Sequence, residues 1–216
     1  MNVTQLLSVI FTAGVVFDNL STSRPATGRF LETGDTTGVR GRSDLALLED
    51  LKSAGEFILN TPATSVDASY LKRINAKLTR SAALNPGSLR TDDQGIGVRT
   101  RYGRHEPPAL SDSELDTLID DALNHPDPKH ASVDLFLQVA RAQPFEDGNK
   151  RTAIFAANGY LLAQQSPFLL TAPFDEDDPS VTEHFNDLLA RFYMFGEDGP
   201  VRELLLGRGV VAKQCP

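Results

Sequence analysis

The chain has 216 residues, 40% hydrophobic and 23% charged, a balance that excludes intrinsically disordered and fibrous proteins. Its length is enough for one large domain or two small ones. The net charge of −8 argues against general nucleic-acid binding, so we expect no nucleic-acid partner.

An apolar run covers residues 3–17. No basic residue precedes it, no small-residue cleavage pattern follows it, and it is too short to span a membrane. We therefore interpret it as a buried first helix rather than a signal peptide. This interpretation predicts a cytoplasmic protein with no membrane partner.

Apolar residues at spacings of three and four predict two further helices before residue 80. The first is marked by Leu45, Leu48, Leu51 and Ile58, and the second by Leu71, Ile74 and Leu78. Residues 25–42 are rich in Gly and Thr and predict a loop or a short strand pair.

Residues 92–108 interrupt the helical pattern. Ile96, Val98, Thr100 and Tyr102 occupy alternate positions between glycines, which predicts a β-hairpin.

Arginines accompany this hairpin in an otherwise acidic chain. They are Arg90, just before it, and Arg99, Arg101 and Arg104 within it. One explanation is a strand edge that pairs with an extended target segment and steers acidic partners or nucleotide. The other is ordinary charge that protects an edge strand, and both stay open.

Helical periodicity resumes after the hairpin. Ser111 and Glu114 form a capping box that opens a helix, the next helix runs directly into Gln143, and Asp178-Pro179 begins a later one. The predicted buried faces are Leu115, Leu118, Ile119, Ala122 and Leu123, then Val133, Phe136, Leu137 and Ala140, then Val181, Phe185, Leu188, Leu189 and Phe192.

The stretch that begins at Ala153 is apolar nearly all round, as expected of a helix in the middle of a bundle. The predicted fold class is therefore all-α with one small β-hairpin. We expect one domain over residues 1–216, with N-terminal helices and a loop in 1–60, a core in 61–195 and a C-terminal tail in 196–216.

The loop between two of these helices, residues 143–151, reads Q-P-F-E-D-G-N-K-R. Gly148 permits a close backbone approach, and the first N–H groups of the following helix are free to bind an anion. Lys150 and Arg151 oppose the helix dipole in that first turn, and a bound phosphate explains their presence.

Asp147 beside such an anion site suggests a divalent cation, because a carboxylate can hold Mg²⁺ while the metal bridges phosphate oxygens. Phe145 is predicted to anchor the loop in the core. The competing interpretation is a solvated turn with Asp147-Gly148 as an ordinary turn dipeptide.

These residues resemble the motif of the Fic/Doc family, H-P-F-x-[DE]-G-N-G-R-x-x-R, and its Doc variant with N-K-R. The matching positions are Pro144, Phe145, Asp147, Gly148, Asn149, Arg151 and, further along, Asn158. The resemblance implies a Fic-type helical bundle in which the hairpin is a target-binding flap.

The resemblance also implies an ATP-binding protein that transfers AMP onto protein hydroxyls. By position, Asp147 would hold Mg²⁺, Gly148 and Asn149 would cradle the phosphates, and Lys150 and Arg151 would bind them, Arg151 also acting in catalysis. The flap residues would be Ile96, Val98, Arg99, Thr100 and Arg101, with a target protein bound along them.

Gln143 occupies the position of the family's catalytic histidine. A neutral amide cannot take the proton of a target hydroxyl, and loss of a general base typically costs about 10²–10⁴-fold in rate. Ile154 replaces the family's second arginine, and we find no match to the family's inhibitory motif. His105, His130 and His184 are other proton acceptors in principle, although no pattern places them near the loop.

Three functions are compatible with this loop. The first is a Fic-like AMP transferase with weak or altered activity. The second is a catalytically inactive protein-interaction module that retains the loop for structure. The third is a Doc-like protein kinase toxin, favoured by Lys150, for which an antitoxin-like partner is expected.

Overall fold

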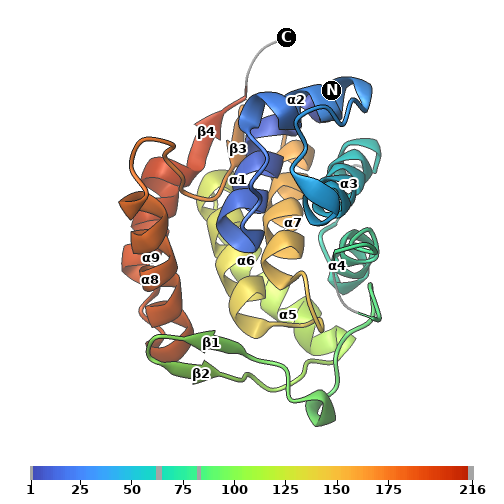
Figure 1. Cartoon of the computed structure of the whole chain (residues 1–216). Helices are drawn as coiled ribbons and strands as arrows, with labels where there is room; N and C mark the ends of the chain where they lie inside the picture. The colour runs from blue at the N-terminus through green and yellow to red at the C-terminus, as the bar shows by residue number, and fades with distance from the viewer. Residues whose placement is uncertain (1, 62–64, 82–83, 214–216) are drawn as a thin grey trace.

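Helix α7 (Asn149–Ala163) runs through the middle of the molecule, and the other elements are arranged around it (Figure 1). The structure is a computed structural model that describes residues 2–61, 65–81 and 84–213. Four helices pack against α7: α6 (Pro128–Ala142), α4 (Ala68–Asn75), α3 (Gly41–Asn60) and α1 (Leu7–Asp18).

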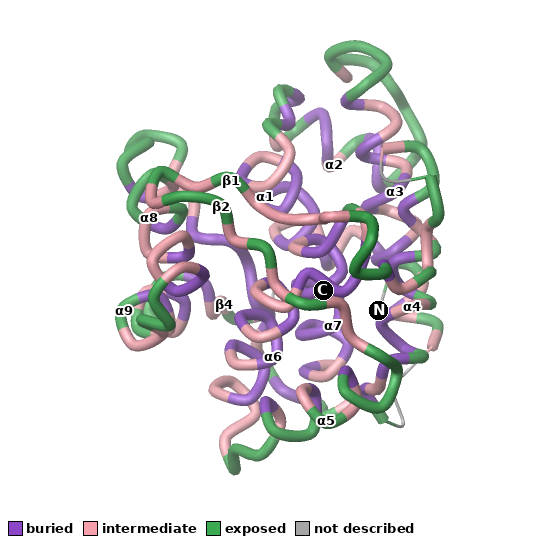
Figure 2. Tube along the Cα trace, turned by 90° about the horizontal axis from the view of Figure 1, so that it is seen from below, coloured by how far each residue is buried: buried purple, intermediate pink, exposed green. Residues whose placement is uncertain are grey.

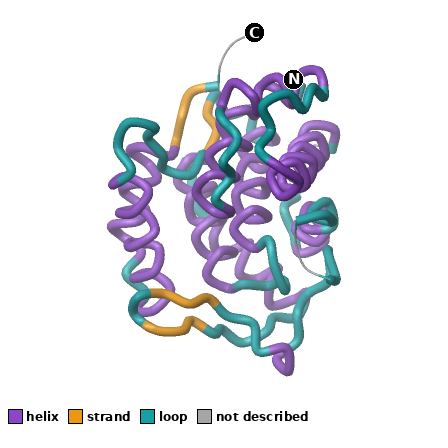
Figure 3. Tube along the Cα trace, in the orientation of Figure 1, coloured by secondary structure: helices purple, strands orange, loops and turns teal. Residues whose placement is uncertain are grey.

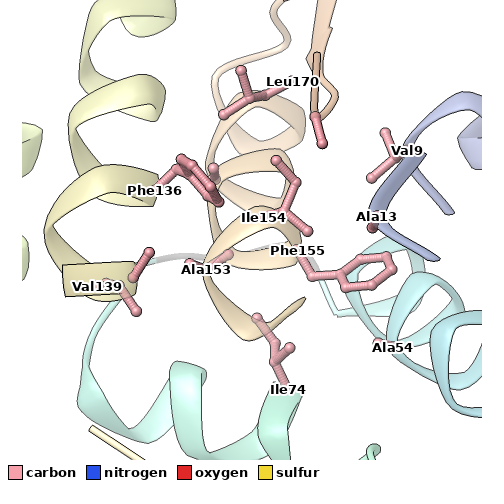
Figure 4. Packing of buried hydrophobic residues seen from close by; sticks show 14 of the residues in the cluster. Val9, Ala13, Ala54, Ile74, Phe136, Val139, Ala153, Ile154, Phe155 and Leu170 are labelled. Carbon is pink, nitrogen blue, oxygen red and sulfur yellow. The ribbon is translucent and has the colours of Figure 1, made fainter. Parts of the chain in front are cut away.

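The apolar character of α7 explains its central position. Ile154 and Phe155 are fully buried, and Figure 4 shows side chains of the surrounding helices beside them. These side chains are Phe136 and Val139 of α6, Ile74 of α4, Ala54 of α3, and Val9 and Ala13 of α1. The prediction of a helix buried in the middle of a bundle is confirmed, because a helix that is apolar all round requires neighbours on every side.

The N-terminal apolar run forms a short 3₁₀ helix, η1 (Val3–Leu6), followed by α1. Both contribute to the core, which confirms the predicted buried first helix. Within the described parts of the chain, no helix combines the length and apolar character needed to cross a lipid bilayer.

The prediction of a loop or strand pair over residues 25–42 is confirmed only for residues 34–40, which form a loop, and is wrong for the residues before and after them. Helix α2 (Arg24–Thr33) begins there with Pro25 in its first turn, and it ends where Gly34 adopts a φ of 76°. Phe30 and Leu31 are buried against the rest of the core. Tertiary burial of this short apolar face outweighs the weak helix propensity of Gly and Thr on which the prediction rested.

The later helices agree with the sequence pattern. Helix α5 (Asp112–Leu123) begins with the predicted capping box between Ser111 and Glu114, and α8 (Ser180–Phe195) begins directly after Pro179. The predicted helix from Leu71 to Leu78 is shorter than expected: Leu78 is buried but lies beyond the end of α4.

Strands β1 (Val98–Thr100) and β2 (Gly103–His105) form the predicted antiparallel hairpin, in which Val98 pairs with His105. The 3₁₀ helix η2 (Asp92–Gln94) precedes it. The predicted all-α fold class with a small β-hairpin is confirmed.

A second strand pair was missed by the sequence analysis. β3 (Phe168–Leu170) pairs with β4 (Val210–Ala212) at the opposite end of the molecule from the hairpin (Figure 3). Helix α9 (Asp198–Leu204) and the π-helical segment η3 (Leu205–Gly209) lead into β4. Val201 and Leu205 are buried in the same core cluster as the N-terminal helices, so α9 and η3 are part of the packed structure.

The hairpin crosses the end of the bundle at which α6 ends and α7 begins (Figures 1 and 2). Its first segment is attached to the loop between these helices, because Leu89 bridges Phe145 and the Arg90 N–H donates to the Pro144 carbonyl at 3.0 Å. The fold therefore holds the hairpin directly beside the loop.

Arg90, which precedes the hairpin, hydrogen-bonds both to the loop and to the segment that follows the hairpin. Its guanidinium donates to the carbonyl of Gln143 at 2.6 Å and to those of Pro107 and Pro108 at 2.7 and 3.0 Å. The side chain is only 3% exposed, so it cannot belong to the charged outer edge in which the sequence analysis placed it. Arg90 is buried because the carbonyl groups of Gln143, Pro107 and Pro108 require a hydrogen-bond donor inside the protein.

We expect Arg90→Met to lower the free energy of unfolding by about 2 kcal/mol or more, because three carbonyl oxygens lose their donor inside the protein. Urea denaturation followed by circular dichroism measures this change. Arg99→Met is the matched control, since Arg99 is exposed and its replacement should change stability by no more than about 0.5 kcal/mol. Equal effects of the two substitutions would contradict the assignment.

Candidate functional site

Two residues with positive φ enclose the loop between α6 and α7. Gln143 ends α6 with a φ of 48°, and Gly148 precedes α7 with a φ of 72°. A Cβ on Gly148 would lie 2.5 Å from Leu78 Cδ1, so this position excludes a side chain for steric as well as conformational reasons.

Asn149 closes the loop with its side chain. Its Oδ1 accepts from the Phe145 N–H at 2.8 Å, and its Nδ2 donates to the Phe145 carbonyl at 2.9 Å and to Gln143 Oε1 at 3.1 Å. Phe145 is 1% exposed, as predicted for an anchor in the core. The Asn149 amide is therefore used inside the loop, and its backbone N–H is the group that it can offer to a ligand.

The N-terminus of α7 faces the loop without a side-chain cap among the residues that the structure describes. The N–H groups of a first helical turn have no acceptor within the helix, and they carry the positive end of the helix dipole. This end of α7 can therefore bind an anion.

Gln143 lies at the edge of this site with its amide hydrogen-bonded at both ends. Nε2 donates to the Ala140 carbonyl, and Oε1 accepts from Asn149. The residue is 5% exposed and lines the cavity described below. Gln143 therefore supports the loop, and its amide cannot accept a proton at neutral pH.

Arg151 is buried beneath the loop and already has partners. Its Nη1 donates to Ser81 Oγ at 2.7 Å, and its Nε lies 3.3 Å from Asp18 Oδ2. A weaker ion pair joins Nη2 to Asp147 Oδ1 at 3.6 Å. The guanidinium is 2% exposed, so these oxygens replace the solvation that it loses.

Lys150 and Asp18 lie close to Arg151 and have perturbed acidities. Burial lowers the pKa of Lys150, whose Nζ lies 5.1 Å from the centre of the Phe17 ring, and the Asp18 charge opposes this shift. Burial raises the pKa of Asp18, and the Arg151 charge opposes that shift. The site therefore contains its own carboxylate among the groups that an external anion would contact.

A cavity of about 330 Å³ opens beside these groups. Its wall consists of the loop and the start of α7 on one side, and of Phe17, Asp18 and the first part of the hairpin on the other. All the predicted phosphate and metal residues line it: Asp147, Gly148, Asn149, Lys150 and Arg151. The structure thus places these residues around one space, where their predicted roles stay predictions.

A second cavity of similar volume, about 330 Å³, lies against α8. Val98, Arg99 and Lys150 line both spaces, so the two cavities adjoin one another across these side chains. Asn186, Leu189 and Tyr193 of α8 form part of the second wall.

The predicted flap residues divide between the two cavities. Ile96 lines the first, Thr100 and Arg101 line the second, and Val98 and Arg99 line both. The tip of the hairpin is attached to α8, because Tyr102 Oη donates to Asp187 Oδ1 at 2.8 Å and Arg101 Nη1 lies 3.0 Å from the same oxygen.

The histidines lie elsewhere. His105 is on β2, where its Nε2 is 2.7 Å from the Arg141 carbonyl and its ring stacks on Tyr193. His130 stacks on His125 at the start of α6, and His184 is exposed on α8. Among the described residues that line the two cavities, there is no histidine.

Asp147 is the carboxylate best placed to hold a metal ion. Its side chain is 55% exposed and borders the first cavity, while Oδ1 accepts the Gly148 N–H. The described residues contain no cluster of three or more His, Cys, Asp or Glu side chains that could hold a metal alone. A single carboxylate suits Mg²⁺, which retains water and takes further ligands from phosphate oxygens.

Sequence reasoning missed three residues of this site: Asp18, Asn75 and Ser81. Asp18 and Ser81 contact Arg151, and Asn75 contacts the backbone of Asp147. They come from α1, from the end of α4 and from the segment after it. No local pattern marks them, because their roles depend on which residues they meet across more than 60 positions of sequence.

Comparison with known proteins supports the resemblance noted in the sequence. Residues 65–161 match the model of the Fic/DOC family. The comparison with curated proteins found no match.

Solved structures share the fold at low sequence identity. Fic-1 from C. elegans has a TM-score of 0.69 at 16% identity over 96% of this chain and 63% of its own. A Fic domain containing signaling protein from Bacteroides thetaiotaomicron has a TM-score of 0.66 at 16% identity, over 95% of this chain and 84% of its own. BepC from Bartonella tribocorum, with bound AMPPNP, has a TM-score of 0.55 at 16% identity over 79% and 87%.

Residues 65–161 are therefore similar to the Fic/DOC family, the chain shares the fold of solved Fic proteins, and the loop of the candidate site lies inside the matched range.

We expect Asp18→Asn to strengthen sulfate binding by about fivefold near neutral pH, the equivalent of ~1 kcal/mol, because a negative charge beside the anion site is removed. Two-dimensional NMR titration with sodium sulfate measures the affinity. Asp35→Asn is the control, since Asp35 is exposed and lines neither cavity. Unchanged affinity in the Asp18 variant would contradict this electrostatic account.

The acidity of Asp18 also predicts that sulfate affinity depends on pH. Because burial raises the pKa of Asp18, its carboxyl takes up a proton at a higher pH than an exposed aspartate. Sulfate keeps its charge over this range, so sulfate affinity should rise as the pH falls from about 7 to about 5. The Asp18→Asn variant should lose this part of the rise, and a variant with the full rise would contradict the prediction.

Proposed function

We propose that this protein binds ATP with Mg²⁺ and transfers AMP onto hydroxyl groups of a target protein, with low activity because Gln143 lacks a proton-accepting group. The observation that carries the proposal is the single cavity that Asp147, the uncapped start of α7, Lys150 and Arg151 share. The AMPPNP found in the related BepC structure supports a nucleotide as the ligand.

Each loop residue has a role that its position allows. The backbone N–H of Asn149 binds a phosphate oxygen, the Gly148 N–H does so once it leaves Asp147 Oδ1, and Lys150 and Arg151 neutralise the phosphate charge. Asp147 holds Mg²⁺, which screens the charge that develops on the phosphates. Arg151 exchanges its contact with Asp18 for a contact with phosphate.

The reaction forms a bond between the target hydroxyl oxygen and the α-phosphorus while the bond to the pyrophosphate oxygen breaks. The hydroxyl proton has to leave during this step. The amide of Gln143 cannot accept it, and no histidine is among the described cavity residues. Positioning and charge stabilisation do not require a base, so a slow reaction remains.

The hairpin supplies the surface for the target. β1 pairs only with β2 among the described strands, so its outer edge has backbone groups free for an added strand. Arg99 is exposed on β1 and lines both cavities, where it attracts an acidic target segment or the nucleotide. This placement favours the target-binding explanation of the hairpin arginines for Arg99, whereas Arg104 is paired with Glu106.

A Doc-like protein kinase is the second candidate. Lys150 supports it, because its side chain lines both cavities and can contact phosphates of a nucleotide bound in either direction. A reversed nucleotide presents its γ-phosphate to the target hydroxyl. In this case a protein partner of the antitoxin type is expected.

We expect ATP to bind in a saturable manner in the presence of Mg²⁺. We expect Asp147→Ala to remove the effect of Mg²⁺ on this binding, because Asp147 is the most exposed carboxylate among the described residues that line the first cavity. Calorimetric titration with and without EDTA measures both. Glu146→Ala is the control from the same loop. Absence of ATP binding in the unaltered protein would refute the proposal and favour the interaction module.

We expect Gln143→His to raise AMP transfer by about 10²-fold or more, because a histidine at this position beside the first cavity can accept the proton of the target hydroxyl. Cell extract incubated with ATP labelled at the α-phosphate measures the transfer. Gln143→Asn retains an amide and should give no increase. A parallel reaction with γ-labelled ATP identifies the kinase, because only phosphoryl transfer leaves that label on protein.

A further inference from the structure

Asn75, the last residue of α4, connects three segments that surround the candidate site. Its Nδ2 donates to the Asp147 carbonyl and to Thr152 Oγ1, each at 3.0 Å, and its Oδ1 accepts from the Gly87 N–H at 2.7 Å. The residue is 3% exposed. Both amide donors and the acceptor are thus used, which fixes the orientation of the side chain.

Close packing of α4 on α7 holds Asn75 in place. A Cβ on Gly159 of α7 would lie 2.4 Å from Tyr70 Oη, so the two helices approach at this glycine. Leu71 and Ile74 of α4 are fully buried. The helix that carries Asn75 therefore has little freedom to move relative to α7.

The contact with Asp147 determines the backbone of the predicted metal-binding residue. Asn75 holds the Asp147 carbonyl, and a Cβ on the next residue, Gly148, would lie 3.3 Å from Asn75 Nδ2 and 2.5 Å from Leu78 Cδ1. Asn75 and Leu78 therefore restrict the orientation of the peptide between Asp147 and Gly148. The N–H of this peptide donates to Asp147 Oδ1, so its orientation helps to set the direction of the Asp147 carboxylate.

We propose that Asn75 is a positioning residue for Mg²⁺, which acts by fixing Asp147 and, through Gly87, by joining the loop to the segment that leads to the hairpin. The proposal rests on the proposed function, in which Asp147 holds Mg²⁺ with the nucleotide. Residues that orient a metal ligand typically change metal affinity by about 10–100-fold when they are replaced.

Asn158 provides a matched control. It is also a buried asparagine with three hydrogen bonds: its Nδ2 donates to the carbonyls of Ile154 and Leu170 at 2.8 and 2.7 Å, and its Oδ1 accepts from the Leu170 N–H at 3.0 Å. The two bonds to Leu170 attach β3 to α7, away from the loop. Loss of either amide removes the same number of hydrogen bonds, but only Asn75 contacts Asp147.

The test compares Asn75→Ala and Asn158→Ala with the unaltered protein. Calorimetric titration with ATP at a series of MgCl₂ concentrations gives the Mg²⁺ concentration at which ATP binding is half-maximally strengthened. We expect Asn75→Ala to raise this concentration by about tenfold, with little change in ATP binding in EDTA. Asn158→Ala should leave the Mg²⁺ concentration and the ATP binding in EDTA unchanged, even if it lowers the melting temperature as much as Asn75→Ala does.

If Asn75→Ala does not fold, Asn75→Asp serves, because it keeps the acceptor for Gly87 and loses only the two donors. Its added negative charge would attract a cation, so a higher Mg²⁺ requirement in this variant can come only from lost positioning. An unchanged Mg²⁺ requirement in the variant that folds, or an equal rise in Asn158→Ala, overturns the proposal for Asn75 alone. Absence of any Mg²⁺-dependent ATP binding in the unaltered protein overturns it together with the proposed function.

Discussion

The burial of α7 is the constraint on which the rest of this structure depends. A helix that is apolar on every side excludes water along its length, so its polar groups can meet a ligand only at its ends. Its C-terminal half is attached to β3 through Asn158, and its N-terminus lies at the end of the bundle that the hairpin crosses. The candidate site is thus located where the central helix leaves its backbone donors unsatisfied.

Cations in the first turn of α7 make this end strongly positive, and the protein balances them with its own carboxylates. Arg151 is almost fully buried and is paired with Asp18 and Asp147. A guanidinium in this position is costly without an anion. The protein therefore holds an internal anion beside the proposed phosphate site, and under the proposed function a nucleotide phosphate competes with Asp18 and Asp147 for Arg151.

Gln143 meets the structural requirements of the loop without supplying a group that can accept a proton. The loop needs a residue with positive φ at the end of α6 and an acceptor for Asn149, and the glutamine meets both requirements. Chemistry at a target hydroxyl additionally needs a titratable group, which an amide does not provide. Under the proposed function, the loop retains the groups that bind phosphate, whereas Gln143 supplies no titratable group at its own position.

The sequence by itself determined the elements whose information is local: the periodic helices, the capping box at Ser111, the alternating hairpin, and a loop whose composition indicates phosphate and metal. It could not reveal α2, whose weak propensity is overcome by burial of Phe30, or the pairing of β3 with β4, which are separated by about 40 residues of other structure. Only the tertiary structure decided that Arg90 is buried and donates to the Gln143 carbonyl, that Asp18 pairs with Arg151, and that Asn75 donates to the Asp147 carbonyl. Such contacts join residues far apart in the chain, and a side chain's role there depends on the partner that folding places beside it.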